Sequence, residues 1–324
     1  MKDFSGKLAV VTGGGTGIGR ELVRQLVAEG CSVAMCDVSS ENMAKTAAMC
    51  ATGAPKSVKV TTHLCDVSIE DEVLQFRDEV VEQQGRDYIN LLFNNAGIGG
   101  GGSLVLDSRE VWEKTFAVCW YGVYYNARAF LPLLLASDEG HMINTSSVNG
   151  FWASLGPMTP HTAYSAAKFA VKGFSEALIN DFRNNAPHVK VSVVMPGHIG
   201  TDIAINSAKI LGTPDPIDMT DEELAPVREH FVKMGADVTA MSNNDIRQAI
   251  KQQGEDFRDH APTSAAEAAT VMLNGVREEQ WRILIGADAQ NLDESVRAAP
   301  EEAYEPSFMK KLIIGSTLAP PQRT

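Results

Sequence analysis

Basic side chains are scarce in this sequence relative to acidic ones. Its 324 residues carry 28 Lys and Arg against 41 Asp and Glu, which gives a formal net charge of −13. Nucleic acids and anionic membrane surfaces are bound by basic protein surfaces. We therefore expect neither a nucleic acid nor a membrane as a partner of this chain.

Long apolar runs are also absent from the sequence. No stretch reaches the roughly 20 apolar residues that a membrane-spanning helix requires. Near the N-terminus, Leu8–Val11 is too short for the apolar core of a secretory signal and has the length of a first strand. Hence we expect neither a signal peptide nor a membrane anchor.

Cysteines are few and follow no pattern of a known site. Their number is odd and they lack C-x-x-C spacing, which argues against a disulfide framework and against a cysteine metal site. Disulfides are rare in cytosolic proteins. We interpret the five as reduced thiols of a cytoplasmic protein that holds no metal; they are Cys31, Cys36, Cys50, Cys65 and Cys119.

Apolar residues make up 44% of the chain, which is enough for one large hydrophobic core. Short apolar strands alternate with helical patterns along the sequence. This alternation predicts a parallel sheet covered by helices on both faces. The expected fold class is α/β, a doubly wound parallel sheet of the Rossmann type in a single domain.

A glycine-rich turn stands between the first strand and the first helical pattern. After Leu8–Val11 the sequence reads Thr12-Gly13-Gly14-Gly15-Thr16-Gly17-Ile18-Gly19. Glycines let the backbone turn tightly and approach a pyrophosphate, whose charge suits a helix N-terminus. The second strand ends in Asp37, where a carboxylate can accept hydrogen bonds from ribose hydroxyls. The pattern predicts a dinucleotide site rather than an ordinary turn beside a solvated aspartate.

Tyr164 and Lys168 are four residues apart, which places both on one face of a helix. A phenol has a reference pKa of about 10, and a nearby ammonium lowers it by about 1–3 units. With Thr162 as the helix N-cap, the helix dipole would add to that effect. Ser147, upstream, could hold a carbonyl or hydroxyl oxygen while Tyr164 moves its proton. Taken alone, such a pair is more often a solvated chance pair.

Five motifs in order resemble those of the classical short-chain dehydrogenases/reductases, over about residues 7–286. They are Thr12-Gly13-x-x-x-Gly17-x-Gly19, Asn94-Asn95-Ala96-Gly97, Ser147, the Tyr164 and Lys168 pair, and Pro196-Gly197-x-Ile199-x-Thr201. The resemblance implies hydride transfer between a nicotinamide and a carbonyl or alcohol carbon. It further implies that Tyr164 is the acid/base, that Lys168 holds the nicotinamide ribose, and that Ser147 binds the substrate oxygen.

The same resemblance implies a set of residues that bind the cofactor. Asp66 matches the residue that meets the adenine, and Ile199 and Thr201 match residues near the nicotinamide carboxamide. The family also implies a small-molecule substrate and a homodimer or homotetramer. The full cofactor set is Gly13, Thr16, Gly17, Ile18, Gly19, Asp37, Asp66, Val67, Asn95, Ala96, Gly97, Tyr164, Lys168, Pro196, Gly197, Ile199 and Thr201.

NAD is expected in preference to NADP. A 2′-phosphate would lie against the carboxylate of Asp37, and the next three residues, Val38, Ser39 and Ser40, carry no positive charge to offset it. Thr16 stands in the glycine turn where members of the family that prefer NADP often carry a basic residue.

Domain organisation follows from the same comparison of motifs. We expect a dehydrogenase domain over residues 1–286 and a C-terminal extension over residues 287–324. Residues 200–262 correspond to the region that the family uses as a substrate lid, and here they are long, polar and proline-bearing. A lid that excludes water is one interpretation, and an oligomer contact or surface insertion is the other.

Two departures from the family pattern affect the predicted site. The segment between Ser147 and Tyr164 is longer than usual, and its apolar residues either form a wall of the substrate pocket or plug the core. These apolar residues are Phe151, Trp152, Leu155 and Met158. For the nearby His161 and His198 we expect a surface or indirect role rather than catalysis.

The second departure is Cys119, which lies in a long helix predicted over Ser108–Ala136. The family usually has an asparagine at this position, where it helps carry a water-linked proton relay from the lysine. Cysteine is a small hydrophobe and a weak hydrogen-bond donor. The relay is therefore in question in this chain.

The sequence thus predicts an NAD-dependent oxidoreductase that acts on a secondary alcohol or ketone, with an apolar substrate. The alternative is a catalytically weak protein of the same fold that binds and senses NAD, which Cys119 motivates. Reduction of a carbon–carbon double bond is a poor match to Ser147 with the Tyr164 and Lys168 pair.

Overall fold

Seven parallel strands form the central sheet of the computed structural model, which describes residues 1–155, 159–233, 237–238 and 240–308. Their order across the sheet is β3-β2-β1-β4-β5-β6-β9. This is the predicted doubly wound α/β fold of the Rossmann type. The strands are β1 (Leu8–Thr12), β2 (Ser32–Asp37), β3 (Val60–Leu64), β4 (Leu91–Asn94), β5 (Gly140–Thr145), β6 (Val189–Pro196) and β9 (Arg282–Ile285).

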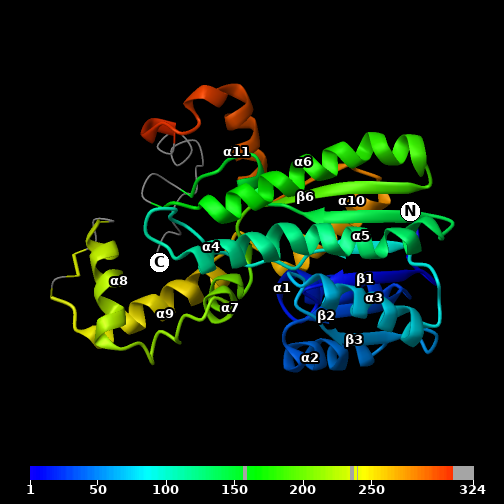
Figure 1. Ribbon diagram of the computed structural model, residues 1–324, viewed down its shortest axis with the longest axis horizontal. Coiled ribbons are helices and arrows are strands. Elements are labelled where there is room, and N and C mark those ends of the chain that lie inside the picture. Colours follow the sequence, from blue (N-terminus) through cyan, green and yellow to red (C-terminus); the bar gives the residue numbers. More distant parts are fainter. Residues whose placement is uncertain (156–158, 234–236, 239, 309–324) are drawn as a thin grey trace, which may run out of the picture.

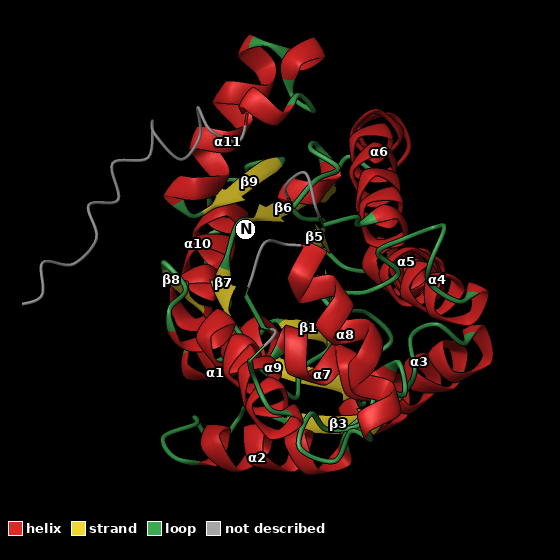
Figure 2. Cartoon of the chain, turned by 90° about the vertical axis from the view of Figure 1, so that its left-hand side faces the viewer, coloured by secondary structure: helices red, strands yellow, loops and turns green. Residues whose placement is uncertain are grey.

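Helices cover both faces of this sheet (Figure 2). Helices α1 (Gly17–Ala28), α2 (Ser40–Ala51) and α10 (Ala265–Arg277) share one hydrophobic core with the sheet. Helices α3 (Glu70–Gln84), α5 (Gly122–Leu135) and α6 (Thr162–Asn185) share the other. Leu8, Ala9, Val10 and Val11 of β1 alternate between the two cores, and all five residues of the strand, Thr12 included, are buried. Such an apolar run is what a sheet covered on both faces requires.

The strand order changes direction between β1 and β4, which are neighbours in the sheet. All strands are parallel, so the loops that follow them leave the same edge. The Thr12 hydroxyl at the end of β1 accepts the backbone N–H groups of Asn95 and Ala96, each at 3.0 Å, just after β4. These bonds fix the two loops that border the crevice at the point of reversal.

The long helix predicted over Ser108–Ala136 is interrupted. It consists of α4 (Arg109–Phe116), a π-helical turn over Ala117–Tyr121, and α5. The Gly122 N–H bonds to the Ala117 carbonyl to close the wide turn. A Cβ at Gly122 would lie 2.7 Å from a methyl carbon of Val67, so the helix approaches the loop after β3 closely at this point. Sequence periodicity does not report such a local widening.

The predicted lid region forms an arm with both ends anchored. Strands β7 (Ile199–Gly200) and β8 (Thr263–Ser264) pair in parallel where the arm begins and ends. Between them lie α7 (Ile203–Ile210), α8 (Asp221–Lys233) and α9 (Asn243–Asp259). Helices α8 and α9 extend away from the sheet (Figure 1). They enclose a small core of their own, made of Met219, Leu224, Val238 and Ile246 with half-buried neighbours.

The C-terminal extension packs against the segment that follows β5. It contains α11 (Ala287–Ala298) and a 3₁₀ turn over Pro300–Glu302, and the turn after β5 is a 3₁₀ helix over Val148–Gly150. Trp152 is buried in a cluster with Leu292 and Phe308, and its Nε1–H donates to the Ala303 carbonyl at 2.7 Å.

This packing decides between the two interpretations of the apolar segment. Trp152 and the half-buried Phe151 plug a small core instead of lining a substrate pocket. Of the two alternatives, the core plug is therefore correct for these two residues, and the extension supplies a partner that the sequence pattern did not reveal. Leu155 is exposed, and Met158 lies outside the described residues.

Among the described residues no helix is long and apolar enough to cross a membrane. All five cysteines are free and buried.

Candidate active site

The glycine turn closes tightly on the start of α1. Gly13 and Gly17 have φ values of +68° and +52°, in the left-handed region that favours glycine. A Cβ at Gly19 would lie 2.0 Å from the Gly13 carbonyl oxygen, so only glycine fits there. In the described chain no side chain caps the N-terminus of α1 at Thr16, and no acidic residue stands in its first turn. Its terminal N–H groups therefore fit the pyrophosphate of a dinucleotide.

Asp37 ends β2 beside this turn. Its carboxylate accepts the backbone N–H groups of Gly15 and Ser39, each at 3.0 Å. Burial raises the pKa of this carboxyl above its ordinary value, more than these hydrogen bonds and the Arg20 guanidinium lower it. Sequence reasoning missed Arg20, whose guanidinium donates to the Gly15 carbonyl and to the Thr46 hydroxyl.

Asp66 follows β3 at the same edge of the sheet. Its carboxylate accepts hydrogen bonds from the Lys114 ammonium at 2.6 Å and from the Ser68 hydroxyl at 2.6 Å. Burial raises the pKa of Asp66, but the bonds from Lys114 and Ser68 outweigh it and hold the pKa below its usual value. Val67 is buried against Gly122. No motif pointed to Lys114, which comes from α4.

Asn95, Ala96 and Gly97 run from β4 toward the middle of the site. Besides the bonds to the Thr12 hydroxyl, the Asn95 side chain donates to the Thr12 carbonyl at 3.1 Å. A Cβ at Gly97 would lie 3.4 Å from the Lys168 Nζ. The loop that the sequence assigns to the nucleotide is thus in contact with the predicted catalytic lysine.

Ser147, Tyr164 and Lys168 lie together at this edge of the sheet. Lys168 is 2% exposed, donates to the Thr145 carbonyl at 2.9 Å, and has its Nζ 5.3 Å from the centroid of the Tyr164 ring. The Ser147 hydroxyl lies near enough to the Tyr164 phenol to lower its pKa, and it accepts the Asn149 N–H at 3.1 Å. The structure therefore brings together the three residues that sequence reasoning selected.

The pKa of Tyr164 is shifted in the direction opposite to the expected one. Burial raises the pKa of its phenol above the ordinary value, while Lys168 and Ser147 lower it by less and Cys119 raises it further. This holds although Tyr164 is only half-buried. The expected lowering is wrong for the protein by itself, because desolvation outweighs the nearby ammonium. The phenol is accordingly protonated near neutral pH.

The start of α6 also differs from expectation. The N-cap is His161, and Thr162 is the first helical residue. The Thr162 hydroxyl is engaged elsewhere, donating to the Gly101 carbonyl and accepting the Trp112 Nε1–H at 3.1 Å. Carbonyls of Gly101 and Gly102 accept the first N–H groups of the helix. Because carbonyl oxygens satisfy these groups, the helix dipole adds little to the ionisation of Tyr164.

Cys119 makes a hydrogen bond that joins the π-helical turn to the loop after β4. Its side chain is fully buried, and its Sγ–H donates to the Ile98 carbonyl at 3.2 Å. The sulfur lies 3.8 Å from where a Cβ of Gly97 would stand. Cys119 therefore borders the lysine side of the site and ties the helix to the loop after β4.

The motif after β6 closes the ring of predicted residues. Pro196 ends the strand, and the Gly197 N–H donates to the Ile285 carbonyl at 2.9 Å. Ile199 is buried in β7. The Thr201 methyl would lie 3.1 Å from a Cβ at Gly17, so this motif meets the glycine turn.

Helix α7 is bonded to both the glycine turn and the loop after β4. The Ser207 hydroxyl accepts the Gly99 N–H at 2.8 Å, and the Asn206 amide donates to the Thr16 hydroxyl at 3.5 Å. The His198 backbone N–H donates to the Asp288 carboxylate, and its side-chain Nε2 lies 2.7 Å from the Phe257 carbonyl oxygen. His161, by contrast, packs on Tyr164, with ring centroids 4.6 Å apart.

Comparisons with known proteins agree with this geometry. A family model described as short chain dehydrogenase matches residues 7–210. The putative oxidoreductase SadH of Mycobacterium tuberculosis (strain ATCC 25618 / H37Rv) is 34% identical over 294 residues, which are 90% of this chain and 91% of that protein.

Among solved structures, a short chain dehydrogenase/reductase from Burkholderia phymatum in complex with NAD is 26% identical, with a TM-score of 0.70, over 92% of this chain and 96% of that one. A metagenomic short-chain oxidoreductase in complex with NADP is also 26% identical, with a TM-score of 0.52, over 78% of this chain and 91% of that one. A nicotinamide cofactor therefore fits the site described above, and the chain belongs to the short-chain dehydrogenase/reductase family of oxidoreductases.

Proposed function

We propose that this protein transfers a hydride between NAD and the carbon of a secondary alcohol or ketone. The observation that carries the proposal is the contact of Ser147 and Lys168 with Tyr164, at the sheet edge that also bears the glycine turn. Bound there, the nicotinamide supplies or accepts the hydride. We assign residues 1–286 to the dehydrogenase domain, with residues 200–262 as the cover of the substrate site.

We assign binding and orientation of the cofactor to the residues that follow the strands at the carboxyl edge of the sheet. The uncapped N-terminus of α1 binds the pyrophosphate, and Asp37 accepts hydrogen bonds from the adenosine ribose. Lys168 holds the nicotinamide ribose, while Ile199 and Thr201 lie at the carboxamide. The remaining residues of the predicted set line this path, which α7 covers against water.

Proton transfer is assigned to Tyr164. During reduction, Ser147 donates a hydrogen bond to the ketone oxygen, and the protonated phenol gives its proton to that oxygen as the hydride reaches the carbon. The phenolate that remains is stabilised by the Lys168 ammonium. In oxidation the same proton returns from the alcohol to Tyr164. General acid–base catalysis of this kind contributes about 10²–10⁴-fold.

The preference for NAD rests on Asp37 and its surroundings. A 2′-phosphate would approach the Asp37 carboxylate. The Arg20 guanidinium beside it is already bound to the Gly15 carbonyl and the Thr46 hydroxyl. The negative charges of the 2′-phosphate and of the Asp37 carboxylate would repel each other, which disfavours NADP.

Assembly as a homodimer or homotetramer is part of the proposal. Tyr121, the last residue of the π-helical turn, and Tyr124 on α5 are 41% and 37% exposed. Exposed aromatic side chains of this kind are enriched at protein–protein interfaces. Light scattering on the purified protein measures the number of subunits. The five buried free thiols suit the cytoplasm, where we place the protein.

A screen of neutral secondary alcohols with NAD and NADP, and of ketones with the reduced forms, tests the proposal. We expect NAD-linked turnover that Tyr164→Phe abolishes while NADH still binds. Tight NADH binding without turnover of any alcohol or ketone would instead support the sensing protein.

A further inference from the structure

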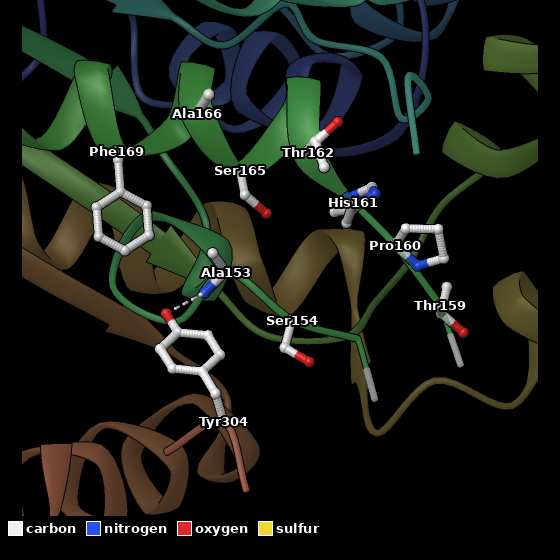
Figure 3. A pocket seen from close by; sticks show the side chains of 10 residues that line it. All are labelled: Ala153, Ser154, Thr159, Pro160, His161, Thr162, Ser165, Ala166, Phe169 and Tyr304. Carbon is white, nitrogen blue, oxygen red and sulfur yellow. Dashed lines mark hydrogen bonds between the residues drawn. The ribbon is translucent and has the colours of Figure 1, made fainter. Parts of the chain in front are cut away.

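A cavity of about 710 Å³ lies between α6, the segment before it and the C-terminal extension (Figure 3). Its volume is within the range of pockets that hold small molecules, about 300–1,000 Å³. One wall comes from Tyr304, which lies beyond the residues 7–210 that the family model matches. The cavity therefore includes a residue from outside the part of the chain that the family model covers.

Two other lining residues, His161 and Ser154, contact groups that surround the catalytic residues. His161 lines the cavity and packs on the Tyr164 ring, with 4.6 Å between centroids. Ser154 lines the cavity as well, and its carbonyl accepts the Asn149 side-chain N–H at 2.9 Å. The Asn149 backbone N–H in turn donates to the Ser147 hydroxyl. A molecule in the cavity thus lies next to the groups that position Tyr164 and Ser147.

The outer wall is fixed in place by hydrogen bonds. The Tyr304 hydroxyl accepts the Ala153 N–H at 3.1 Å, which Figure 3 draws as a dashed line. The preceding residue, Ala303, accepts the Trp152 Nε1–H, and the Trp152 ring packs near Phe308. Tyr304 is therefore held against the cavity rather than free to swing away.

The lining is neutral and mostly apolar, with a few hydroxyl groups. In the described residues that line the cavity no side chain is permanently charged. Burial lowers the pKa of His161 to about 4, so its ring is neutral near pH 7. The apolar part consists of Ala153, Pro160, Ala166 and Phe169. An uncharged ligand suits such a lining because a charged one would be desolvated without a partner.

Ser165 gives a second, independent indication of a ligand. It is 3% exposed, and among the described residues its hydroxyl has no hydrogen-bond partner. The hydroxyl points from α6 toward Ala153 and Ser154 (Figure 3). A buried hydroxyl without a partner costs about 1–3 kcal/mol. An oxygen atom of a bound molecule would remove that cost.

We propose that this cavity binds the part of a neutral, largely apolar substrate that is remote from the reacting carbon, and that Tyr304 and Ala166 set the length of substrate accepted. The inference rests on the proposed function, since it assumes that the reacting carbon lies at Tyr164. It adds a specificity site built by the C-terminal extension.

Linear 2-ketones from butan-2-one to decan-2-one, reduced with NADH, are the probe. Each methylene buried in the cavity raises kcat/KM by at most about fourfold, so the wild-type protein favours the long ketones. Ala166→Leu places a larger side chain into the cavity from an exposed helical position. We expect it to lower kcat/KM for decan-2-one at least about tenfold and to leave butan-2-one within about twofold.

The matched control is Ala48→Leu, the same substitution at an exposed position of α2. It should leave kcat/KM unchanged for both butan-2-one and decan-2-one. Tyr304→Ala removes the outer wall and should flatten the dependence on chain length as well. An unchanged dependence on chain length in Ala166→Leu overturns the inference.

Binding of decan-2-one, followed by quenching of tryptophan fluorescence, provides a readout without turnover. Ala166→Leu should weaken this binding, whereas Tyr164→Phe should keep it. If Ala166→Leu weakens binding and no ketone is reduced, the cavity is a ligand site and the proposed function is wrong. If Ala166→Leu binds decan-2-one as the wild type does, the cavity is not the site, whatever the turnover.

Discussion

The nucleotide side and the substrate side of this site are built in different ways. On the nucleotide side, backbone turns at the ends of adjacent strands are joined by short-range packing and by the Thr12 hydroxyl. On the substrate side, Ala153 bonds to Tyr304 and Trp152 bonds to Ala303, across about half the length of the chain. Both sides therefore join distant segments, but the residues of the first side stand in recognisable short motifs, whereas the second side depends on a tail without one.

The two sides also differ in how closely they are packed. A Cβ at Gly19 would collide with the Gly13 carbonyl, so the turn accepts no side chain there. The proposed substrate side borders an open pocket of about 710 Å³. Substitutions should consequently act through the cofactor on one side and through the choice of substrate on the other.

The largest effect is expected at Tyr164, where the two sides meet. Tyr164→Phe removes only the hydroxyl, so turnover should fall by about 10²–10⁴-fold while NADH binding persists. Steady-state kinetics and NADH fluorescence titration measure the two quantities. Near-normal turnover would show that another group carries the proton.

Asp37→Ala tests the nucleotide side by itself. Loss of hydrogen bonds to a charged group costs about 1.5–3 kcal/mol, so kcat/KM with NAD should fall about 10–100-fold. The value with NADP should change less, because the repulsion disappears together with the bonds. Steady-state kinetics with NADH and NADPH on one ketone give the ratio of the two kcat/KM values. A wild-type preference for NADPH would contradict the assignment.

Trp152→Phe tests the substrate side. It removes the N–H that binds the Ala303 carbonyl and should lower the free energy of unfolding by about 1–3 kcal/mol. The KM for a long ketone should rise while the KM for NADH stays constant. Urea unfolding measures the change in stability, and steady-state kinetics measure the two KM values. Trp281→Phe, at a residue 45% exposed, is the matched control. An equal rise in both KM values would show that the two sides are not separable.

Cys119 gives the smallest effect, although it replaces the usual asparagine of the family. A serine can donate to the Ile98 carbonyl as the thiol does, so Cys119→Ser should change kcat by less than about twofold. Cys119→Asn should have only a modest effect, because a backbone carbonyl near Cys119 can anchor a water of the relay. If the wild type binds NADH without turnover and Cys119→Asn restores activity, the sensing interpretation is correct.

Sequence reasoning reached the sheet and the Ser147, Tyr164 and Lys168 cluster because their spacing follows directly from strand and helix geometry. It did not reach Lys114 or Arg20, which meet their partners only after folding. The sign of the pKa shift at Tyr164 was missed for a similar reason, since burial depends on the packed protein rather than on the neighbouring lysine. Trp152 shows the same limit, because its partners come from a tail without any recognisable motif.

The pairing of β7 with β8 has a consequence for how the arm over residues 200–262 can vary. The chain leaves and re-enters at adjacent strands, so the two ends of the insertion stay together whatever lies between them. Each doubling of a flexible loop adds only about 0.6 kcal/mol of closure entropy. Because α8 and α9 also pack on a core of their own, the arm can be lengthened, shortened or exchanged as a module with little strain on the sheet.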